Sequence, residues 1–422
     1  MRRFFCKTMN TKKVENNIKL YIFVILLGAV VGIVLWAFLR LLGLCKDFLW
    51  HIIPEAIGVN FISVIICAVG GLLMGLLHKR YGDYPEELPI VLGKIKRDRH
   101  YEYHPMLALL ACAFIPLAFG ASVGPEAGLT GIVAGLCYWL GDNVKYAKQH
   151  ADAYSNIGAA VMLGSLFHSP LFGIFAVEED TAYEETVENF GLPKVSKLLL
   201  YGLSMASAFL VMKGLGAVFC ALDVGFPGFE AANVMPADYW LILLYVPVGL
   251  VLFAAYFYAK KLAGLVSSKI PVIVRETICG LCIGIMSMLV PAVLFSGEEQ
   301  MGLLPDLFMG YTPAMLIGVS FLKIVMTTFC IEFGLKGGHF FPLIYACSSM
   351  GFGVALLIFG AGAPAHAVFA AAIITAATLG AQIRRPIAVS MLLLICFPFR
   401  FVLWILLAAA AGVRTSALIT RD

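Results

Sequence analysis

The residues most able to do chemistry lie in a glycine-rich motif, GASVGPEAG at residues 120–128. Glycine lets the backbone approach a ligand closely, and Pro125 suits the first turn of a helix, where its missing N–H is not needed. A helix that starts here presents unpaired N–H groups and a partial positive charge, which together favour a bound anion. Glu126 stands where that anion would bind. Its carboxylate can fill the site when ionised and leave it when protonated.

A second glycine-rich motif, GLKGGHFFP at residues 334–342, offers a matching helix start later in the chain. Its glycines free the backbone, so the amides of His339, Phe340 and Phe341 could face the same anion, with Gly338 leaving room for it. The imidazole of His339 fits a packed, neutral side chain better than a proton carrier. The two motifs together predict one anion site built from two helix starts.

Composition sets the solvent in which these motifs act. The 422 residues are 61% hydrophobic and 13% charged, whereas soluble domains carry about 25% charged residues and about 45–50% apolar ones. So much apolar surface needs the bilayer as its solvent, which excludes most soluble enzymes. The net charge of +4 is modest, and clustered Lys and Arg with interleaved aromatic residues, typical of nucleic-acid binding, are missing from the sequence.

Two interpretations of Glu126 remain possible. A carboxylate at a helix N-terminus can simply stabilise the helix dipole, which is the favoured interpretation in a soluble protein. Inside a membrane an ionisable group is costly and is rarely without function. We therefore expect Glu126 to act as a gate, with Gly124, Pro125 and Ala127 around the anion.

Two further segments carry weaker signals. The apolar run from Ser169 ends in acids, of which Glu179 or Asp180 could receive protons from the cytoplasm. A solvated acidic cluster at the membrane surface explains them equally well. The segment YGDYPEE at residues 81–87 contains Gly82 and precedes a short apolar run at 88–92. It could be another half-helix directed at the anion, or an ordinary interfacial turn.

The hydrophobic pattern supplies the elements that must position these motifs. We expect spans or part-spans near residues 19–49, 60–78, 105–119, 126–141, 157–179, 195–221, 239–263, 272–295, 313–331, 341–360, 365–381, 386–398 and 400–412. Several are shorter than the roughly 20 residues that cross a bilayer. Broken helices at membrane depth survive only where protein or a water-filled cavity surrounds them, so the breaks indicate a pore or binding site.

Charge asymmetry predicts the orientation and the domains. Basic residues gather in the N-terminal segment and in residues 94–99, 145–148 and 260–269, whereas 222–238 and 296–306 hold acids without Lys or Arg. The positive-inside rule therefore predicts a cytoplasmic N-terminus. We expect a cytoplasmic segment at 1–18 and a transmembrane domain at 19–422. Its two halves would be repeats, at about 60–222 and 239–420, with no C-terminal regulatory domain. Paired broken helices in two such halves point to a midplane substrate site.

Other chemistries find little support. The CxxC at Cys279 and Cys282 lies in an apolar run without a second pair or a nearby histidine, so no metal, cofactor or redox role is expected. Ser122, Ser165 and His168 offer hydroxyls and an imidazole for an intramembrane enzyme. However, GASVG at residues 120–124 matches GxSxG only in spacing, without the strand before it that a nucleophile elbow needs, and the sequence has no HExxH set, so catalysis is only a remote alternative.

In this order, these motifs resemble the CLC family of chloride channels and proton–anion antiporters. The segment around Glu126 matches the family's Gly-Arg-Glu-Gly-Pro motif, which aligns Glu126 with the gating glutamate. Residues 337–342 match the Gly-x-Phe-x-Pro motif, with Lys323 and Thr327 at the family's spacing upstream. The stretch from Ser169 resembles the helix that ends in the internal proton-transfer glutamate, so Asp180, or Glu179 beside it, aligns with that residue.

The resemblance covers roughly residues 60–420 and implies a fold, an assembly and an activity. The fold would be an all-α polytopic membrane protein, a CLC-like inverted repeat of tilted and re-entrant helices. The assembly would be a homodimer with one pore per subunit in the cell membrane. The partners would be small inorganic anions, protons and membrane lipid, with no nucleic acid and no enzymatic activity.

The departures from the family pattern bear on selectivity. Gly82 aligns with the family's central serine, Thr415 with its pore tyrosine, and Pro125 with the motif arginine. Two side-chain hydroxyls that coordinate chloride are therefore altered or absent. The fluoride-exporting branch also lacks the serine, but it has an acid and a threonine where this chain has His339 and Phe341. We expect proton–anion exchange with chloride as the leading anion; a passive anion channel and a fluoride-directed transporter are the alternatives.

Overall fold

The computed structural model describes the chain except residues 1, 60, 87–105, 144–150, 179–193, 220–226, 230–233 and 421–422. Helices dominate this described part, and its only β pairing is one isolated bridge. The α-helices are α1 (Arg2–Asp47), α2 (Ile53–Ile57), α3 (Ile62–Tyr81), α5 (Met106–Ala118), α6 (Glu126–Asn143), α7 (Ala151–Leu166), α8 (Pro170–Glu178), α9 (Lys194–Phe219), α10 (Pro236–Ser267), α11 (Val272–Leu289), α12 (Glu298–Leu307), α13 (Pro313–Glu332), α14 (Phe340–Phe359), α15 (Ala367–Ile383), α16 (Pro386–Leu393) and α17 (Val402–Ile419). The predicted all-α fold class is confirmed.

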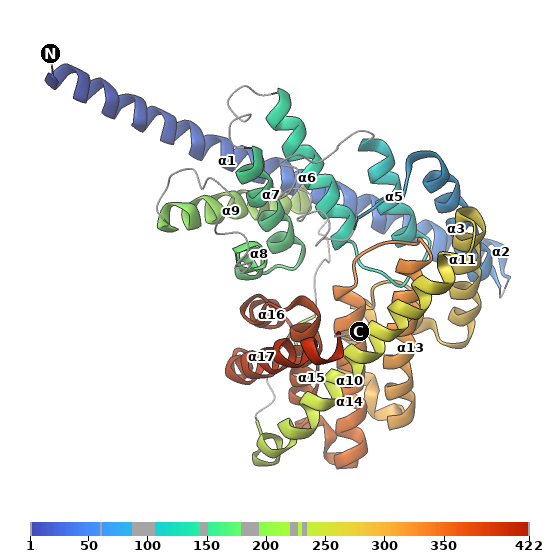
Figure 1. The fold of residues 1–422 in the computed structure, drawn as a ribbon. Helices are drawn as coiled ribbons and strands as arrows, with labels where there is room; N and C mark the ends of the chain where they lie inside the picture. Colours follow the sequence, from blue (N-terminus) through green and yellow to red (C-terminus); the bar gives the residue numbers. More distant parts are fainter. Residues whose placement is uncertain are drawn as a thin grey trace.

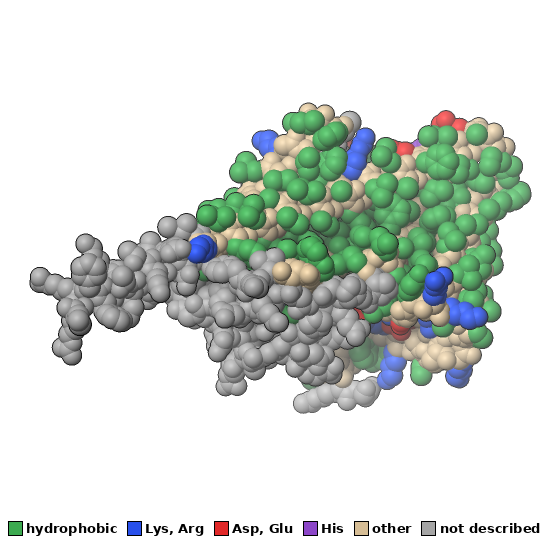
Figure 2. Space-filling view, turned by 90° about the horizontal axis from the view of Figure 1, so that it is seen from above, with side chains coloured by type: hydrophobic (Ala, Val, Ile, Leu, Met, Phe, Trp, Pro, Cys, Tyr) green, Lys and Arg blue, Asp and Glu red, His purple; other side chains and the backbone are tan. Residues whose placement is uncertain are grey.

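Length and hydropathy identify the membrane-spanning elements. Eight helical segments of the described chain are long and apolar enough to cross a bilayer, and α5, α6, α7 and α15 contribute shorter apolar helices. Figure 2 shows hydrophobic side chains over most of the described face, with Lys, Arg, Asp and Glu near its margins. This distribution is that of an integral, multi-pass membrane protein.

Glycines allow the most extensive helix–helix contact among the described residues, between α3 and α11, which lie side by side in Figure 1. A Cβ at Gly71 would overlap the backbone carbonyl of Glu276, and one at Gly280 would overlap that of Cys67. Small residues let membrane helices approach closely, where packing rather than water drives association. Two helices about 200 positions apart in sequence are thus held backbone to backbone.

The predicted single span at 157–179 is wrong, because this segment forms two helices. Helix α7 ends at Leu166 and α8 begins at Pro170, with His168 in a left-handed conformation (φ 52°) between them. Proline disfavours helical geometry in the residue before it. Ser169 then accepts a hydrogen bond from the Phe172 N–H (3.3 Å), as an N-cap does for a new helix.

Two other elements differ from the expected pattern. Helix α1 begins at Arg2, so the basic segment 1–18 and the first span form one continuous helix (Figure 1). Helix α12 occupies residues 298–307, which the sequence marks only as an acidic external segment. Gly297 precedes it with φ 94°, and Glu298 and Glu299 occupy its first turn, where carboxylates stabilise the helix dipole.

We expect Gly280→Ala to destabilise the protein by roughly 1–3 kcal/mol, because the added methyl group overlaps a backbone carbonyl that has no room to move. The unfolding midpoint of purified protein in detergent measures the effect. Gly318→Ala is the matched control, since Gly318 lies mid-helix in α13 with open space at its Cβ position. Equal midpoints for the two variants would contradict the close α3–α11 contact.

Candidate functional site

The two glycine-rich motifs meet in the interior of the fold. The Gly124 N–H donates to the Gly338 carbonyl (2.7 Å), and the Gly338 N–H donates back to the Gly124 carbonyl (2.7 Å). This reciprocal pair is the isolated antiparallel bridge of the structure. Helix α6 starts two residues after Gly124, and helix α14 starts two residues after Gly338. The bridge therefore holds two helix N-termini side by side.

Glu126 fills the space between these helix starts. The residue is 2% exposed, and its Oε1 accepts a hydrogen bond from the Phe340 N–H at the start of α14 (2.7 Å). Its Oε2 is buried without a hydrogen-bond partner among the described residues. A carboxylate of the first motif thus occupies the helix start of the second motif, where free N–H groups favour a negative charge.

Glycine at two positions makes this placement possible. A Cβ at Gly338 would coincide with the carboxyl group of Glu126, and one at Gly124 would overlap its Oε2. The carboxyl group therefore lies directly against two α-carbons. A small anion that replaced it would find the same cradle of backbone atoms.

Aromatic rings form one wall beside the cradle. The Phe341 ring stacks on Phe167, with ring centroids 4.6 Å apart and an interplanar angle of 16°. Phe167 lies at the break between α7 and α8. The expected span at 157–179 did not predict that this residue would border the site. The Ser-Pro step at 169–170 is the signal that would have revealed it, since it predicts a helix start.

Helix α13 packs against the first glycine-rich motif. The Ser122 hydroxyl lies 3.3 Å from the Thr327 hydroxyl, and the fully buried Lys323 extends its Nζ to four carbonyls of residues 292–295. The Phe295 N–H in turn donates to the Gly120 carbonyl (3.4 Å). A buried ammonium satisfied by backbone oxygens thereby fixes the turn against which the motif rests.

The remaining predicted site residues lie as follows. Pro125 and Ala127 are buried beside Glu126, and His339 is buried against the rings of Tyr256 and Phe340. Thr415 directs its hydroxyl at its own helix, toward the Ala411 carbonyl (2.8 Å). The predicted proton acceptors Glu179 and Asp180, and the predicted short helix at 88–92, fall outside the described residues.

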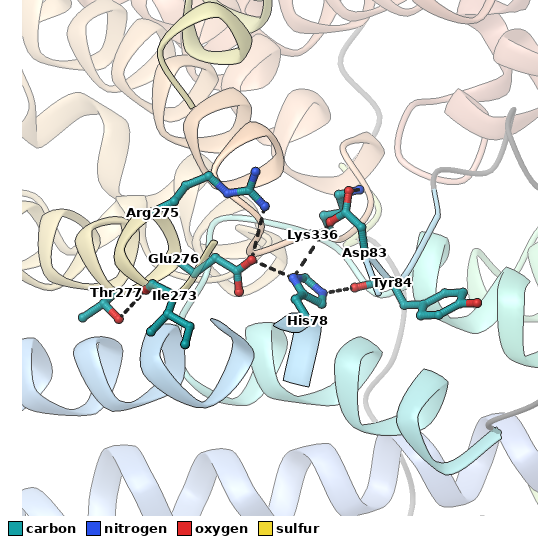
Figure 3. Close-up of polar contacts among 8 residues, drawn as sticks. All are labelled: His78, Asp83, Tyr84, Ile273, Arg275, Glu276, Thr277 and Lys336. Atoms are coloured by element: carbon teal, nitrogen blue, oxygen red, sulfur yellow. Dashed lines mark hydrogen bonds and ion pairs between the residues drawn. The ribbon is translucent and has the colours of Figure 1, made fainter. Parts of the chain in front are cut away.

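Gly82 follows the last residue of α3, has φ 99° and is exposed. The next residue, Asp83, contacts the second glycine-rich motif. The Asp83 carboxylate forms an ion pair with the Lys336 ammonium (2.7 Å), as Figure 3 shows. Partial burial by itself would raise the pKa of the Asp83 carboxyl. The charge and hydrogen bond of Lys336 lower it by more, so the pKa lies below its usual value. No group of three metal-ligating side chains occurs within the described ranges.

Comparison with known proteins identifies the family. The sequence profile described as "Voltage gated chloride channel" matches residues 70–417, which is most of the chain. The chain belongs to this CLC family. The predicted recognition is therefore confirmed, and with it anion transport as the general function of the family.

Individual relatives support the same assignment. The chloride channel protein CLC-e of Arabidopsis thaliana is 25% identical over 353 residues, covering 77% of this chain and 48% of that protein. The chain therefore spans about half the length of this curated CLC relative.

Solved structures share the CLC fold over nearly the whole chain. A slow cyanobacterial Cl⁻/H⁺ antiporter superposes with a TM-score of 0.78 at 18% identity, covering 95% of both chains. A CLC-type fluoride/proton antiporter gives 0.74 at 19% identity, covering 95% of this chain and 96% of the other. A eukaryotic CLC transporter gives 0.70 at 17% identity, covering 96% of this chain and 72% of the other.

We expect Gly338→Ala to cost roughly 1–3 kcal/mol of stability, because its methyl group displaces the Glu126 carboxyl. In a Glu126→Ala background the obstructing group is gone, so the same substitution should cost less than about 1 kcal/mol. Unfolding free energies of the four proteins of this double-mutant cycle measure the difference. An equal penalty in both backgrounds would show that the Glu126 carboxyl does not lie against Gly338.

Proposed function

We propose that this protein exchanges a small inorganic anion, with chloride as the leading candidate, for protons across a membrane, and that Glu126 is the gate. The observation that carries the proposal is the Glu126 carboxylate bound to the Phe340 N–H at the start of α14. An intramembrane carboxylate in a backbone anion site imitates the anion that it excludes.

The chemistry of the cradle provides for alternating occupancy. An ionised Glu126 accepts the Phe340 N–H and fills the space between Gly124 and Gly338. A protonated carboxyl is a weaker acceptor and carries no charge to match the helix dipole, so an anion competes better for the same N–H groups. Each protonation then favours entry of an anion, and each anion departure favours return of the carboxylate. Proton and anion movements are thereby coupled.

The exchange proposal also needs a proton supply from the cytoplasmic side, for which Glu179 and Asp180 remain the sequence-based candidates. A passive anion channel stays the alternative, because a gate that exchanges protons with only one side of the membrane cannot couple the two flows. We further propose the cell membrane as the location, a cytoplasmic N-terminus, and a homodimer with one pathway per subunit. The basic segments support the orientation.

Glu126→Gln keeps the size of the side chain but mimics the protonated gate permanently. We expect proton transport to be lost while anion flux persists or rises, because the amide cannot release a proton or carry the competing charge. Simultaneous proton and chloride flux from proteoliposomes under an imposed chloride gradient measures both. Proton pumping at the wild-type ratio by this variant would refute the proposed gate.

Selectivity among halides and nitrate should be shallow. Gly82 has no side chain, and the Thr415 hydroxyl donates within its own helix, so backbone amides and water are left to coordinate the anion. Each hydrogen bond to a charged group contributes only about 1.5–3 kcal/mol, and a site with few fixed donors discriminates weakly. We expect chloride, bromide and nitrate fluxes within roughly tenfold, equivalent to about 1.4 kcal/mol.

Fluoride holds its water shell most strongly of the four anions and should be carried poorly, unless a protonated His339 donates to it. Reversal potentials for all four anions at two pH values measure this order. A strong preference for fluoride would support the fluoride-directed alternative instead.

A further inference from the structure

A second buried acid contacts the loop that carries the Glu126 site. Glu276, in the first turns of α11, is fully buried, and its Oε1 lies 2.7 Å from Nδ1 of His78, near the end of α3 (Figure 3). The close α3–α11 contact brings these two side chains together. Neither residue belongs to the motifs that the proposed transport function uses.

The hydrogen-bond pattern fixes how many protons the pair holds. His78 Nε2 faces the backbone carbonyl of Tyr84, which can only accept, so this nitrogen carries a hydrogen. The short contact between Nδ1 and Oε1 then needs one further proton, either on the imidazole or on the carboxyl group. Loss of that proton would leave a lone pair facing a carboxylate. In the structure, His78 and Glu276 therefore share one exchangeable proton.

Charged side chains of both signs lie close to this proton. Arg275 Nη2 lies 3.3 Å from Glu276 Oε1, and Asp83 Oδ1 lies 3.9 Å from His78 Nδ1. Lys336 pairs with Asp83. The His78–Glu276 pair with its shared proton has no net charge. Arg275 and Lys336 add two positive charges and Asp83 adds one negative charge, so the cluster carries a net charge of +1. An excess positive charge opposes tight retention of a proton.

Two thiols also lie near the pair. Cys112 of α5 interacts with the His78 side chain, and Cys279 of α11 lies close enough to Glu276 for their charges to interact. These cysteines are buried. Glu276 Oε2 is also buried and has no hydrogen-bond partner within the described part of the chain. The carboxyl group thus retains an acceptor atom that a water molecule can use.

One short loop connects this pair to the gate. The Glu276 carboxyl lies against Gly334, where φ is 101° and a Cβ would overlap it. Four residues later, Gly338 lies against the carboxyl of Glu126. Four extended residues span at most about 14 Å, so the two acids flank a single loop segment. Lys336, midway along it, is held by Asp83.

We propose that His78 and Glu276 form an inner proton-binding site that exchanges protons with Glu126 along the loop at residues 334–338. This inference rests on the proposed exchange function. The end of α3 and the start of α11 lie on the side that the basic segments assign to the cytoplasm. The proton shared by the pair passes through intervening water to the Glu126 carboxylate, and a proton from the cytoplasm then replaces it on the pair. The pair returns to its starting state, so no other reactant is needed.

Glu276→Gln tests the site, because the amide keeps the shape beside Gly334 but cannot carry a transferable proton. We expect proton flux from proteoliposomes to fall at least tenfold, whereas chloride flux stays within about twofold of the wild type, which also shows that the variant folds. Glu299→Gln is the matched control: Glu299 pairs with Lys46 at 3.1 Å and is largely exposed. Unchanged proton coupling in a Glu276→Gln protein with normal chloride flux would overturn the proposal.

Removing one member of a buried pair can prevent folding, so Asp83→Asn provides an independent test at an exposed position. It removes a negative charge near His78 and frees the charge of Lys336, so the protonated pair becomes less stable. Proton flux should then need a lower cytoplasmic pH, with its midpoint shifted by roughly half a unit. No acid shift relative to wild type and Glu299→Gln would contradict the proposal.

Variants at Glu126, Glu179 and Asp180 separate this inference from the function on which it rests. Persistent coupling in Glu126→Gln would reject the exchange function itself. A second outcome is that coupling is lost in the Glu126→Gln variant and also in the Glu179→Gln or the Asp180→Asn variant, but is complete in Glu276→Gln. This outcome would keep the exchange function and assign the inner proton site to the acids after α8. Loss in Glu276→Gln with the Glu179 and Asp180 variants fully coupled would assign it to the His78–Glu276 pair.

Discussion

A helix that starts inside a membrane must find a partner for its free N–H groups, and in this structure the Glu126 carboxylate provides that partner for the start of α14. The rest of the site depends on this requirement. The reciprocal Gly124–Gly338 hydrogen bonds bring the two helix starts together. The absence of side chains at the same two glycines leaves the space that the carboxyl group fills. Helix α13, through Thr327 and Lys323, holds the surrounding turns in place.

The same requirement explains why the centre of the site could be predicted from the sequence. Glycine and proline at a helix start, followed by an acid within an apolar chain, form a local pattern whose physical meaning is independent of distant residues. The composition likewise determines the solvent and, through it, the all-α fold class. Backbone hydrogen bonding and the hydrophobic effect therefore account for the predicted fold class, whereas the family resemblance depends on the motifs themselves.

What could not be predicted depends on contacts between distant segments. His78 and Glu276 are 198 positions apart, and each by itself resembles an ordinary polar residue at a helix end. Only the packing of α3 on α11 makes them neighbours. Phe167 joined the site because a Ser-Pro step breaks what hydropathy presents as one span. Hydropathy averages over a window of residues, so it passes over a three-residue break and over an amphipathic helix such as α12.

The main-chain construction of the proposed anion site has a consequence for its evolution. Every residue except proline carries the same amide N–H, so other substitutions at residues 340 and 341 leave the donor atom unchanged. Substitutions at these positions can alter the width and polarity of the proposed anion pathway while the backbone donors at the helix start stay the same. Homologous chains could therefore diverge widely in sequence and adapt to different anions around one unaltered centre. Gly124 and Gly338 are far more constrained, because any side chain at either position would overlap the Glu126 carboxyl group.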